Sequence, residues 1–533
     1  MANQRPDTKG KGRRREEGGA EPDEKVLAAE RAARRERRRR REEARRRKRR
    51  RYLIRRAAVI GGVLVLILLI VLVAKSCGKN GKSNGVQEDQ VTETPVQTDT
   101  PAEGSETAVA EDTVSAENRA ILDEAEKLAA RYDYDAAMEL LKPYAEEGSE
   151  PAFAEAISRF QATKDSCIAY DVETIPHFFF HSLLNDDRGF KAELVGDFVA
   201  KDNGCWMCST NEFNTMLQQM YDHGCVLVTM RDMVIETKDD NGKVHFEPND
   251  HLMLPPGKTP VVMSEDDLSY YHAYDDQGIA EKLVLDDEGK VKCVYTDESG
   301  TTHIGDYDVV PLLSTFIEEH PDFSYHNAHC IIALTGYNGV FGYRTDEVYK
   351  TREAERLDAN QKEWLDAHPD FNWDEDVAEA KKIAEALKAE GYEFASHTWG
   401  HRHADTASVD SLIRDNERFV NWVVPIIGPV DTIIFAHGSD LQGASDYSYD
   451  NEKYAYFKSV GYNYYSNVDG SVPYWNQIRD EYVRTARINL DGYRLWQAMS
   501  GNSNSIADME ILGIHDIESF FDYARSTPVE IMG

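Results

Sequence analysis

The first 56 residues contain very few large apolar side chains, which excludes a hydrophobic core in this segment. They carry 24 Lys and Arg against 10 Asp and Glu, a net charge of +14, whereas the rest of the 533-residue chain carries 37 against 85, a net charge of −48. No aromatic residue interrupts the arginine-rich run at residues 31–51, so we expect no nucleic-acid partner. We expect residues 1–56 to form a basic cytoplasmic tail, disordered or helical, that binds anionic membrane lipids. A docking helix for a cytoplasmic partner is the alternative.

No small-residue cleavage site follows the apolar run at residues 57–74, and the basic segment before it is far longer than that of a signal peptide. The run contains 18 uncharged, mostly aliphatic residues, which form about 27 Å of helix and just cross a bilayer core. Lys and Arg crowd its N-terminal side, so the positive-inside rule predicts a cytoplasmic N-terminus. We therefore expect one uncleaved transmembrane helix at residues 57–75 in the cell membrane, with everything after it extracellular.

Aromatic residues are nearly absent from residues 76–115, which are rich in Thr, Glu, Gln, Pro, Gly and Ser. This composition cannot bury a core and predicts a disordered linker. Apolar residues return at helical spacing in residues 116–168, with a break at "YDYD", and predict a helical hairpin like half of a tetratricopeptide unit. Because one unit cannot form a solenoid, we expect a small neck that packs against the next domain.

Cysteine pairs at metal-binding spacing are scarce, since the chain's C-x-x-C at Cys205 and Cys208 has no second pair nearby. This argues against a zinc knuckle. In an extracellular domain a disulfide and free buried thiols are both open alternatives. The sequence predicts neither a disulfide pairing nor an oligomeric state.

Residues 170–533 alternate short apolar runs with helical patterns. The runs include "TPVVMS", "AHCIIALTG", "YEFASH" and "DTIIFAHG". This alternation argues for parallel strands joined by right-handed crossovers, either as a barrel or as a doubly wound sheet. Two further segments, "VIETKDDNGKVHFE" and "LVLDDEGKVKCVYT", place a Gly-containing turn between alternating strands and predict inserted β-hairpins.

Side chains of the kinds that bind metals follow several of these runs. Asp266 and Asp267 end the run "VVMSEDD". His397 follows "GYEFAS", and His437 follows "VDTIIFA". Ligands bind at the carboxyl ends of parallel strands, so we expect these groups to meet at one end of the domain. Two imidazoles and one carboxylate can hold a divalent ion and leave a position for water, whose pKa the ion lowers.

Histidine spacing alone is weak support for such a site. His397 and His401 form an H-x-x-x-H pair, but a chain with 16 histidines contains about half of one such pair by chance. A second pair, His177 and His181, occurs in "PHFFFHSLL", where residues four apart share one face of a strand. His181 can line a site at this strand end, or it can be a buried, hydrogen-bonded histidine.

The segments "VVMSEDD" and "SHTWGH" resemble the first two motifs, T-F-D-D and H-[ST]-x-x-H, of the polysaccharide deacetylases of the NodB-homology family, carbohydrate esterase family four. The resemblance covers about residue 176 to the C-terminus. It implies a distorted (β/α) barrel that removes acetyl groups from glycans. Carried over, it makes Asp266 the general base and Asp267, His397 and His401 the ligands of a divalent metal. Zinc is expected, with cobalt, nickel or manganese as alternatives.

The sequence departs from the family's remaining motifs. The first motif lacks the aromatic residue and the closing glycine, and the third motif, "FAHG", contains His437 but lacks the arginine that orients the base. Arg484 or Arg487 could substitute for it, and a simple ion pair is the alternative for each. His515 in "GIHD" is the candidate for the general acid of the last motif. His181, His437 and Arg487 are the candidates for substrate binding.

These features predict a membrane-anchored, extracellular, metal-dependent hydrolase that acts on carbon–nitrogen bonds other than peptide bonds. The expected substrate is an acetylated glycan of the cell surface that contains N-acetylhexosamine, such as peptidoglycan or an exopolysaccharide. The alternative is a catalytically decayed barrel that serves as a membrane-tethered glycan-binding or scaffold protein. The missing arginine, the altered first motif and a gap of about 130 residues between the aspartates and the histidine pair motivate that alternative.

Overall fold

The structure, a computed structural model, describes residues 115–145, 151–470 and 474–525. The predicted basic tail at 1–56, the predicted transmembrane helix at 57–75 and all but the last residue of the predicted linker at 76–115 lie outside these ranges. Among the residues described, no helix combines the length and the apolar composition that a membrane crossing requires.

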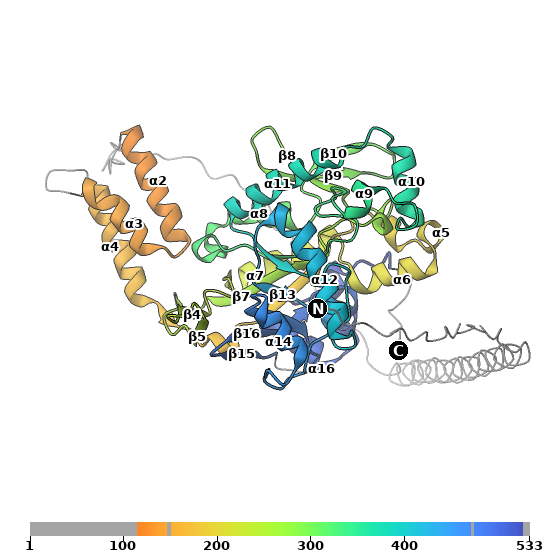
Figure 1. Cartoon of the computed structure of the whole chain (residues 1–533). Helices are drawn as coiled ribbons and strands as arrows, with labels where there is room; N and C mark the ends of the chain where they lie inside the picture. The colour runs from red at the N-terminus through yellow and green to blue at the C-terminus, as the bar shows by residue number, and fades with distance from the viewer. Residues whose placement is uncertain (1–114, 146–150, 471–473, 526–533) are drawn as a thin grey trace, which may run out of the picture. The chain divides into compact units, whose positions relative to one another are not determined.

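Seven parallel strands close into a barrel, which confirms the predicted α/β barrel and excludes an open sheet (Figure 1). In order around the barrel they are β2 (His177–His181), β7 (Thr259–Asp266), β11 (Ile331–Leu334), β12 (Glu393–Ser396), β13 (Thr432–Ile434), β14 (Tyr464–Val468) and β16 (Tyr482–Asn489). The pairing of β16 with β2 closes the ring between the last and the first of these strands along the chain.

Both sides of the barrel wall are buried, as expected for parallel strands covered by helices. Because side chains alternate along a strand, β7 contributes to two cores. Val262 packs inside the barrel with Ile331 and Ile434. Val261 and Met263 pack outside it, in the layer between strands and helices. The same alternation sends Asp266 toward the barrel axis at the end of β7.

Helices surround the barrel, and several start at sequence-encoded caps. The helices of this part are α5 (Ala192–Val195), α6 (Asp197–Trp206), α7 (Thr210–Asp222), α8 (Val309–Glu319), α9 (Glu347–Thr351), α10 (Ala359–Ala367), α11 (Trp373–Glu390), α12 (Val409–Trp422), α13 (Val424–Ile427), α14 (Glu452–Ser459), α15 (Gly492–Met499), α16 (Ser503–Ile511) and α17 (Ile517–Phe520). Ser209 and Glu212 form a capping box at the start of α7. Gly391 ends α11 with φ 112° and sits against Asn327, where a Cβ atom would lie 2.1 Å from the carbonyl oxygen.

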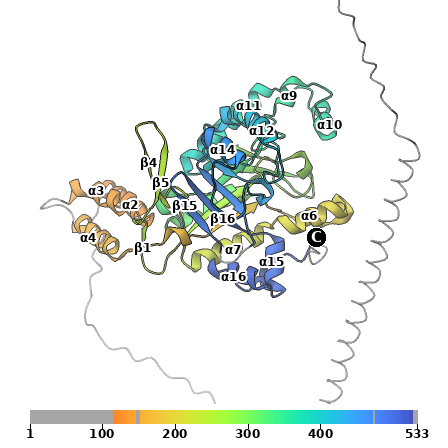
Figure 2. The same ribbon diagram turned by 60° about the horizontal axis from the view of Figure 1, so that its bottom comes forward.

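Short antiparallel strands decorate the barrel. β4 (Val234–Lys238) and β5 (Val244–Pro248) form one hairpin, which projects from the barrel (Figure 2). β8 (Lys282–Leu285) and β9 (Val291–Thr296) form the other, which β10 (Thr302–Gly305) extends. Both predicted hairpins are thereby confirmed. The remaining strands are β1 (Ile168–Ala169), β3 (Cys225–Leu227), β6 (Met253–Leu254) and β15 (Asn476–Arg479).

Three helices occupy the segment predicted as a neck: α2 (Ala116–Ala130), α3 (Tyr134–Leu141) and α4 (Pro151–Ser166). Their apolar faces share one cluster with Leu254, which precedes β7. Tyr132 stacks on Tyr325, with 6.1 Å between ring centroids, and its hydroxyl donates to the carbonyl of Asp322 at 2.7 Å. Leu254 comes shortly before β7 in the chain, and Asp322 and Tyr325 come shortly before β11. The neck therefore contacts the barrel at the amino ends of its strands.

Candidate metal centre

The carboxyl ends of β7, β12 and β13 meet at the end of the barrel opposite the neck contacts. Asp266 ends β7, His397 follows the last residue of β12, and His437 lies in the turn after β13. All three line a cavity of about 650 Å³. The carboxyl ends of these strands therefore bring the three predicted side chains around one cavity.

Asp267, His397 and His401 form a compact ligand set at this cavity. Each offers one nitrogen or oxygen atom, and these atoms lie within 4.8 Å of one another. Nε2 of His401 is 3.4 Å from Oδ2 of Asp267, and the ring centroids of His397 and His401 are 5.1 Å apart. Two histidines and one carboxylate, with open space beside them, have the composition of a catalytic zinc site.

Neighbouring groups prepare two of these residues as ligands. Nδ1 of His397 donates to the carbonyl of Ile434 at 2.8 Å, which leaves the lone pair of Nε2 directed at the cluster. Burial lowers the pKa of His397, so the imidazole is held in the neutral form that binds metals. The hydroxyl of Tyr271 donates to Oδ1 of Asp267 at 2.6 Å and leaves Oδ2 facing His401. The residues present therefore fit a divalent ion.

The backbone around the ligand set is unusual. Asp267 has φ 64°, Thr398 φ 59°, His401 φ 48° and His437 φ 58°. Non-glycine residues seldom adopt this left-handed region, and such conformations concentrate at functional sites. In the loop after β12 they let His401 turn back toward His397, which a continuing strand would not allow.

Asp266 is bound by an arginine that lies far from it in the sequence. Arg487 of β16 donates from its two terminal nitrogens to the two carboxylate oxygens, at 2.7 and 2.8 Å, and both residues are buried. Burial alone would raise the pKa of Asp266, but the charge of Arg487 and its hydrogen bonds hold it well below its ordinary value. Asp266 is therefore an ionised carboxylate in a fixed orientation.

The two arginines considered from the sequence have different partners. Arg487 lines the cavity, but its terminal nitrogens bind Asp266, so it holds the base rather than an open substrate position. Arg484 is buried away from this cluster, where it pairs with Asp440 at 2.6 Å. The predicted substitute for the missing arginine is thus Arg487.

His181 and His437, which the sequence offers as substrate-binding candidates, both line the cavity. His181 pairs in register with Asp266 across β2 and β7, and its Nδ1 donates to the carbonyl of Trp206 at 3.0 Å. The ring centroids of His437 and His401 are 4.1 Å apart, and the ring of His437 stacks on that of His403. Burial and these neighbouring histidines lower the pKa of His437 to about 4.

The structure does not bring His515 to this cavity, so it does not support the prediction of His515 as the general acid. His515 is exposed in the turn after α16, where its backbone N–H donates to Gln219 of α7 at 2.8 Å. Its Nδ1 lies 2.9 Å from the carbonyl of Gly513. The turn is fixed by Ile514, whose side chain enters the layer outside the barrel and leaves His515 at the outer surface.

Several groups at or beside the cavity carried no signal in the sequence. Tyr271, the partner of Asp267, is four residues beyond it in a loop and carried no motif. The cavity is lined by Asp202 and Trp206 from α6 and by Tyr493 from α15. Trp206 stands between the two cysteines of the C-x-x-C and belongs to no motif of its own. Cys205 and Cys208 are both free and buried.

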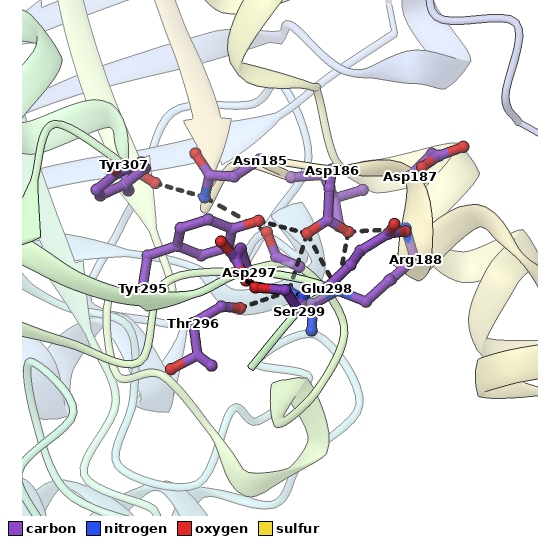
Figure 3. Close-up of polar contacts among 12 residues, drawn as sticks. Asn185, Asp186, Asp187, Arg188, Tyr295, Thr296, Asp297, Glu298, Ser299 and Tyr307 are labelled. Carbon is purple, nitrogen blue, oxygen red and sulfur yellow. Dashed lines mark hydrogen bonds and ion pairs between the residues drawn. The ribbon is translucent and has the colours of Figure 1, made fainter. Parts of the chain in front are cut away.

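A second group of possible ligand atoms lies elsewhere, formed by Asp186, Asp187 and Glu298 (Figure 3). Arg188 donates to both oxygens of Asp186, at 2.8 to 3.0 Å, and Tyr295 donates to it as well. Lys191 lies 3.0 Å from Asp187 and 3.2 Å from Glu298. Burial would raise the pKa of Asp186, but these partners lower it below its ordinary value. The protein's own cations already fill this group.

Comparisons with known proteins add little to this geometry. No protein-family model matches the chain, and no curated protein matches it. A solved structure, a Streptococcus pyogenes deacetylase, PplD, in complex with acetate, matches with a TM-score of 0.30 and 12% sequence identity, over 60% of this chain and 92% of that chain. A TM-score of this size does not establish a shared fold, and the resemblance to NodB-homology deacetylases stays a prediction from the sequence motifs.

Proposed function

We propose that this chain is a metal-dependent hydrolase that removes acetyl groups from cell-surface glycans containing N-acetylhexosamine. The observation that carries the proposal is the division of two adjacent carboxylates between two partners. Asp267 faces His401, whereas Asp266 is held by Arg487. One carboxylate joins a ligand set and its neighbour stays ionised beside it, which is what metal-assisted hydrolysis of an amide requires.

A divalent ion held by Asp267, His397 and His401, with zinc best suited to these donors, would lower the pKa of a bound water and polarise the acetyl carbonyl. The chain's own groups move the protons. Asp266, kept ionised and oriented by Arg487, accepts a proton from the attacking water at a carboxylate oxygen while the new carbon–oxygen bond forms. The carbon–nitrogen bond then breaks, and acetate and the free amine leave.

His181 is the proton donor to the departing nitrogen in this proposal, in place of His515. Its Nδ1 is fixed by the carbonyl of Trp206, which leaves Nε2 as the atom that can transfer a proton. It lines the cavity beside Asp266, on the neighbouring strand. A base and an acid that line the same cavity can thus serve the two proton transfers.

The test is acetate release from N-acetylglucosamine oligomers by the detergent-solubilised full chain. We expect Asp266→Asn and His181→Asn to lower the rate by about 10²- to 10⁴-fold, the usual contribution of a general base or acid. Asp187→Asn is the matched control, because it also removes one carboxylate from a three-residue cluster. If Asp266→Asn releases acetate as fast as the parent chain, the proposal is wrong.

The decayed-barrel alternative makes a different prediction. It was motivated by the missing arginine, and Arg487 supplies an arginine to Asp266 from another strand. A decayed barrel would hold no stoichiometric zinc, cobalt, nickel or manganese after purification and would release no acetate. Elemental analysis of the purified chain together with the acetate assay separates the two.

We also propose that the barrel lies outside the cell and that residues 57–75 anchor it, on the sequence pattern alone. Digestion of intact spheroplasts with a protease checks this placement. The barrel should be cleaved while an epitope at the N-terminus is protected, and the reverse pattern would contradict the predicted orientation.

A further inference from the structure

One wall of the cavity is built by the end of α6 and the start of α15, which lie side by side (Figure 2). A Cβ atom on Gly492 would lie 2.4 Å from the carbonyl oxygen of Gly204, so only glycine allows the two helices to approach this closely. The guanidinium of Arg525 donates to the same carbonyl at 3.2 Å. This wall is therefore a rigid part of the fold.

An aromatic platform forms the surface of this wall. Trp206 and Tyr493 both line the cavity, with 6.1 Å between ring centroids, and Trp206 is 39% exposed. The indole N–H of Trp206 donates to Oδ1 of Asp202 at 3.1 Å, and its carbonyl accepts from His181. An exposed indole whose N–H is held by Asp202 offers a flat apolar face to the C–H face of a pyranose ring.

The same wall carries two carboxylates whose hydrogen-bond donors are neutral groups. Asp491 accepts from the side-chain amide of Asn489 and from the backbone N–H of Arg494, each at 2.7 Å, and both donors are neutral. Asp202 accepts from Trp206. Within the described ranges neither carboxylate forms an ion pair with Lys or Arg.

The two arginines that line the cavity are occupied by other carboxylates. Arg487 binds Asp266, and Arg494 binds Asp508 at 2.8 Å. Burial raises the pKa of both Asp202 and Asp491; hydrogen bonds from Trp206 and Asn489 and the nearby His181 offset this in part, as does Arg494 at Asp491. A cationic ligand at this wall would add the ion pair that neither carboxylate has within the described ranges.

From this juxtaposition of an exposed indole and carboxylates that form no ion pair with a described Lys or Arg, we propose that the wall binds an amine-bearing hexosamine unit next to the acetylated unit that reacts. The sugar ring stacks on Trp206, and its ammonium group meets Asp202. This inference rests on the proposed function and deepens it, because it names the preferred glycan as one that is already partly deacetylated. The product of one reaction then becomes the recognition element for the next.

Binding measurements test this independently of turnover. The full chain in detergent is titrated calorimetrically with a glucosamine tetramer and with the N-acetylglucosamine tetramer. We expect the glucosamine tetramer to bind about tenfold more tightly, the contribution of roughly one charge-assisted hydrogen bond. Asp202→Asn should abolish that preference, and Trp206→Ala should weaken both tetramers.

Asp197→Asn is the matched control, because Asp197 is an exposed carboxylate on the same helix. The control should keep the full preference. Equal binding of both tetramers by the parent chain, or an equal loss in Asp197→Asn and Asp202→Asn, overturns the inference. A chain that keeps the preference but releases no acetate refutes the proposed function alone, whereas acetate release without the preference refutes only this inference.

Discussion

Two clusters in this molecule bring three possible metal ligands equally close together, and only one is prepared to hold a metal. The first consists of Asp267, His397 and His401, and the second consists of Asp186, Asp187 and Glu298. In each cluster the ligand atoms lie within 4.8 Å of one another. In the second cluster Arg188 already binds Asp186 (Figure 3). Lys191 pairs with Asp187.

The first cluster is kept free of such cations. The nearest arginine, Arg487, is bound to the adjacent Asp266, and within the described residues no Lys or Arg pairs with Asp267. Its remaining contact, Tyr271, is a neutral donor. Close ligand atoms therefore indicate a metal site only where the protein's own cations are bound elsewhere.

The largest expected effect concerns metal affinity. Asp267→Asn should weaken zinc binding by roughly a thousandfold or more, because apparent zinc-binding energies of about 10–16 kcal/mol are divided among only a few ligands. Asp187→Asn should leave it unchanged, because Lys191 already occupies that carboxylate. Competition with a fluorescent zinc chelator measures both. Similar losses in the two variants would show that the clusters do not differ as described.

The second effect concerns stability. Arg487→Met should lower the free energy of unfolding by about 4 kcal/mol, since it leaves the buried Asp266 without a partner. Arg188→Met should cost less, about 1 kcal/mol, because Asp186 also accepts from Tyr295 and lies partly exposed. Urea unfolding of the metal-free chain measures both values.

The double variant Asp266→Asn, Arg487→Met is the control for this prediction. It removes the uncompensated charge and should recover much of the loss. If the double variant is as unstable as Arg487→Met alone, the cost comes from lost packing of the arginine and not from the unpaired carboxylate.

The third effect is a loss of ligand support. Tyr271→Phe should lower metal affinity by about 10- to 100-fold, because the hydrogen bond to Oδ1 of Asp267 orients this ligand. Tyr295→Phe makes the equivalent change at Asp186 and should not alter metal binding. Zinc titration of both variants checks this, and an unchanged affinity in Tyr271→Phe would remove the tyrosine from the site.

The smallest effect is a pH dependence of the second cluster. The pKa of Asp186 is lowered in the folded chain, so its contribution to stability is fully present above the ordinary aspartate pKa and is lost as pH falls below it. We expect a loss of about 1 kcal/mol or less below about pH 4. Thermal melts of the parent chain and of Asp186→Asn should converge in this acid range. Parallel melting curves down to pH 3 would contradict the expectation.

The two H-x-x-x-H pairs show how far the sequence could lead. His177 and His181 both lie on β2, a straight strand that carries them to different levels of the barrel: His177 bonds to Thr485 and Ser264 within it, and His181 reaches the cavity. His397 and His401 straddle a turn with positive φ values, so the same spacing brings them together. The strand ends were predictable from periodicity, but the backbone turn was not.

Long-range pairings explain the other differences. Asp266 and Arg487 are 221 residues apart, and only the register of β16 against β2 places the arginine at the base. Motif order suggested His515 as the acid, but motif order does not encode which face of the fold a late loop occupies. Trp206 and Tyr493 carried no sequence signal, because their helices meet only in three dimensions.

The closure of the barrel by its first and last strands also sets an order in time. Every ligand of the candidate metal centre precedes β14, whereas Arg487 arrives with β16. A chain that ends at β14 contains Asp267, His397 and His401 but lacks the arginine that binds Asp266. In the proposed function, the base is therefore oriented only once the last strand of the barrel is in place.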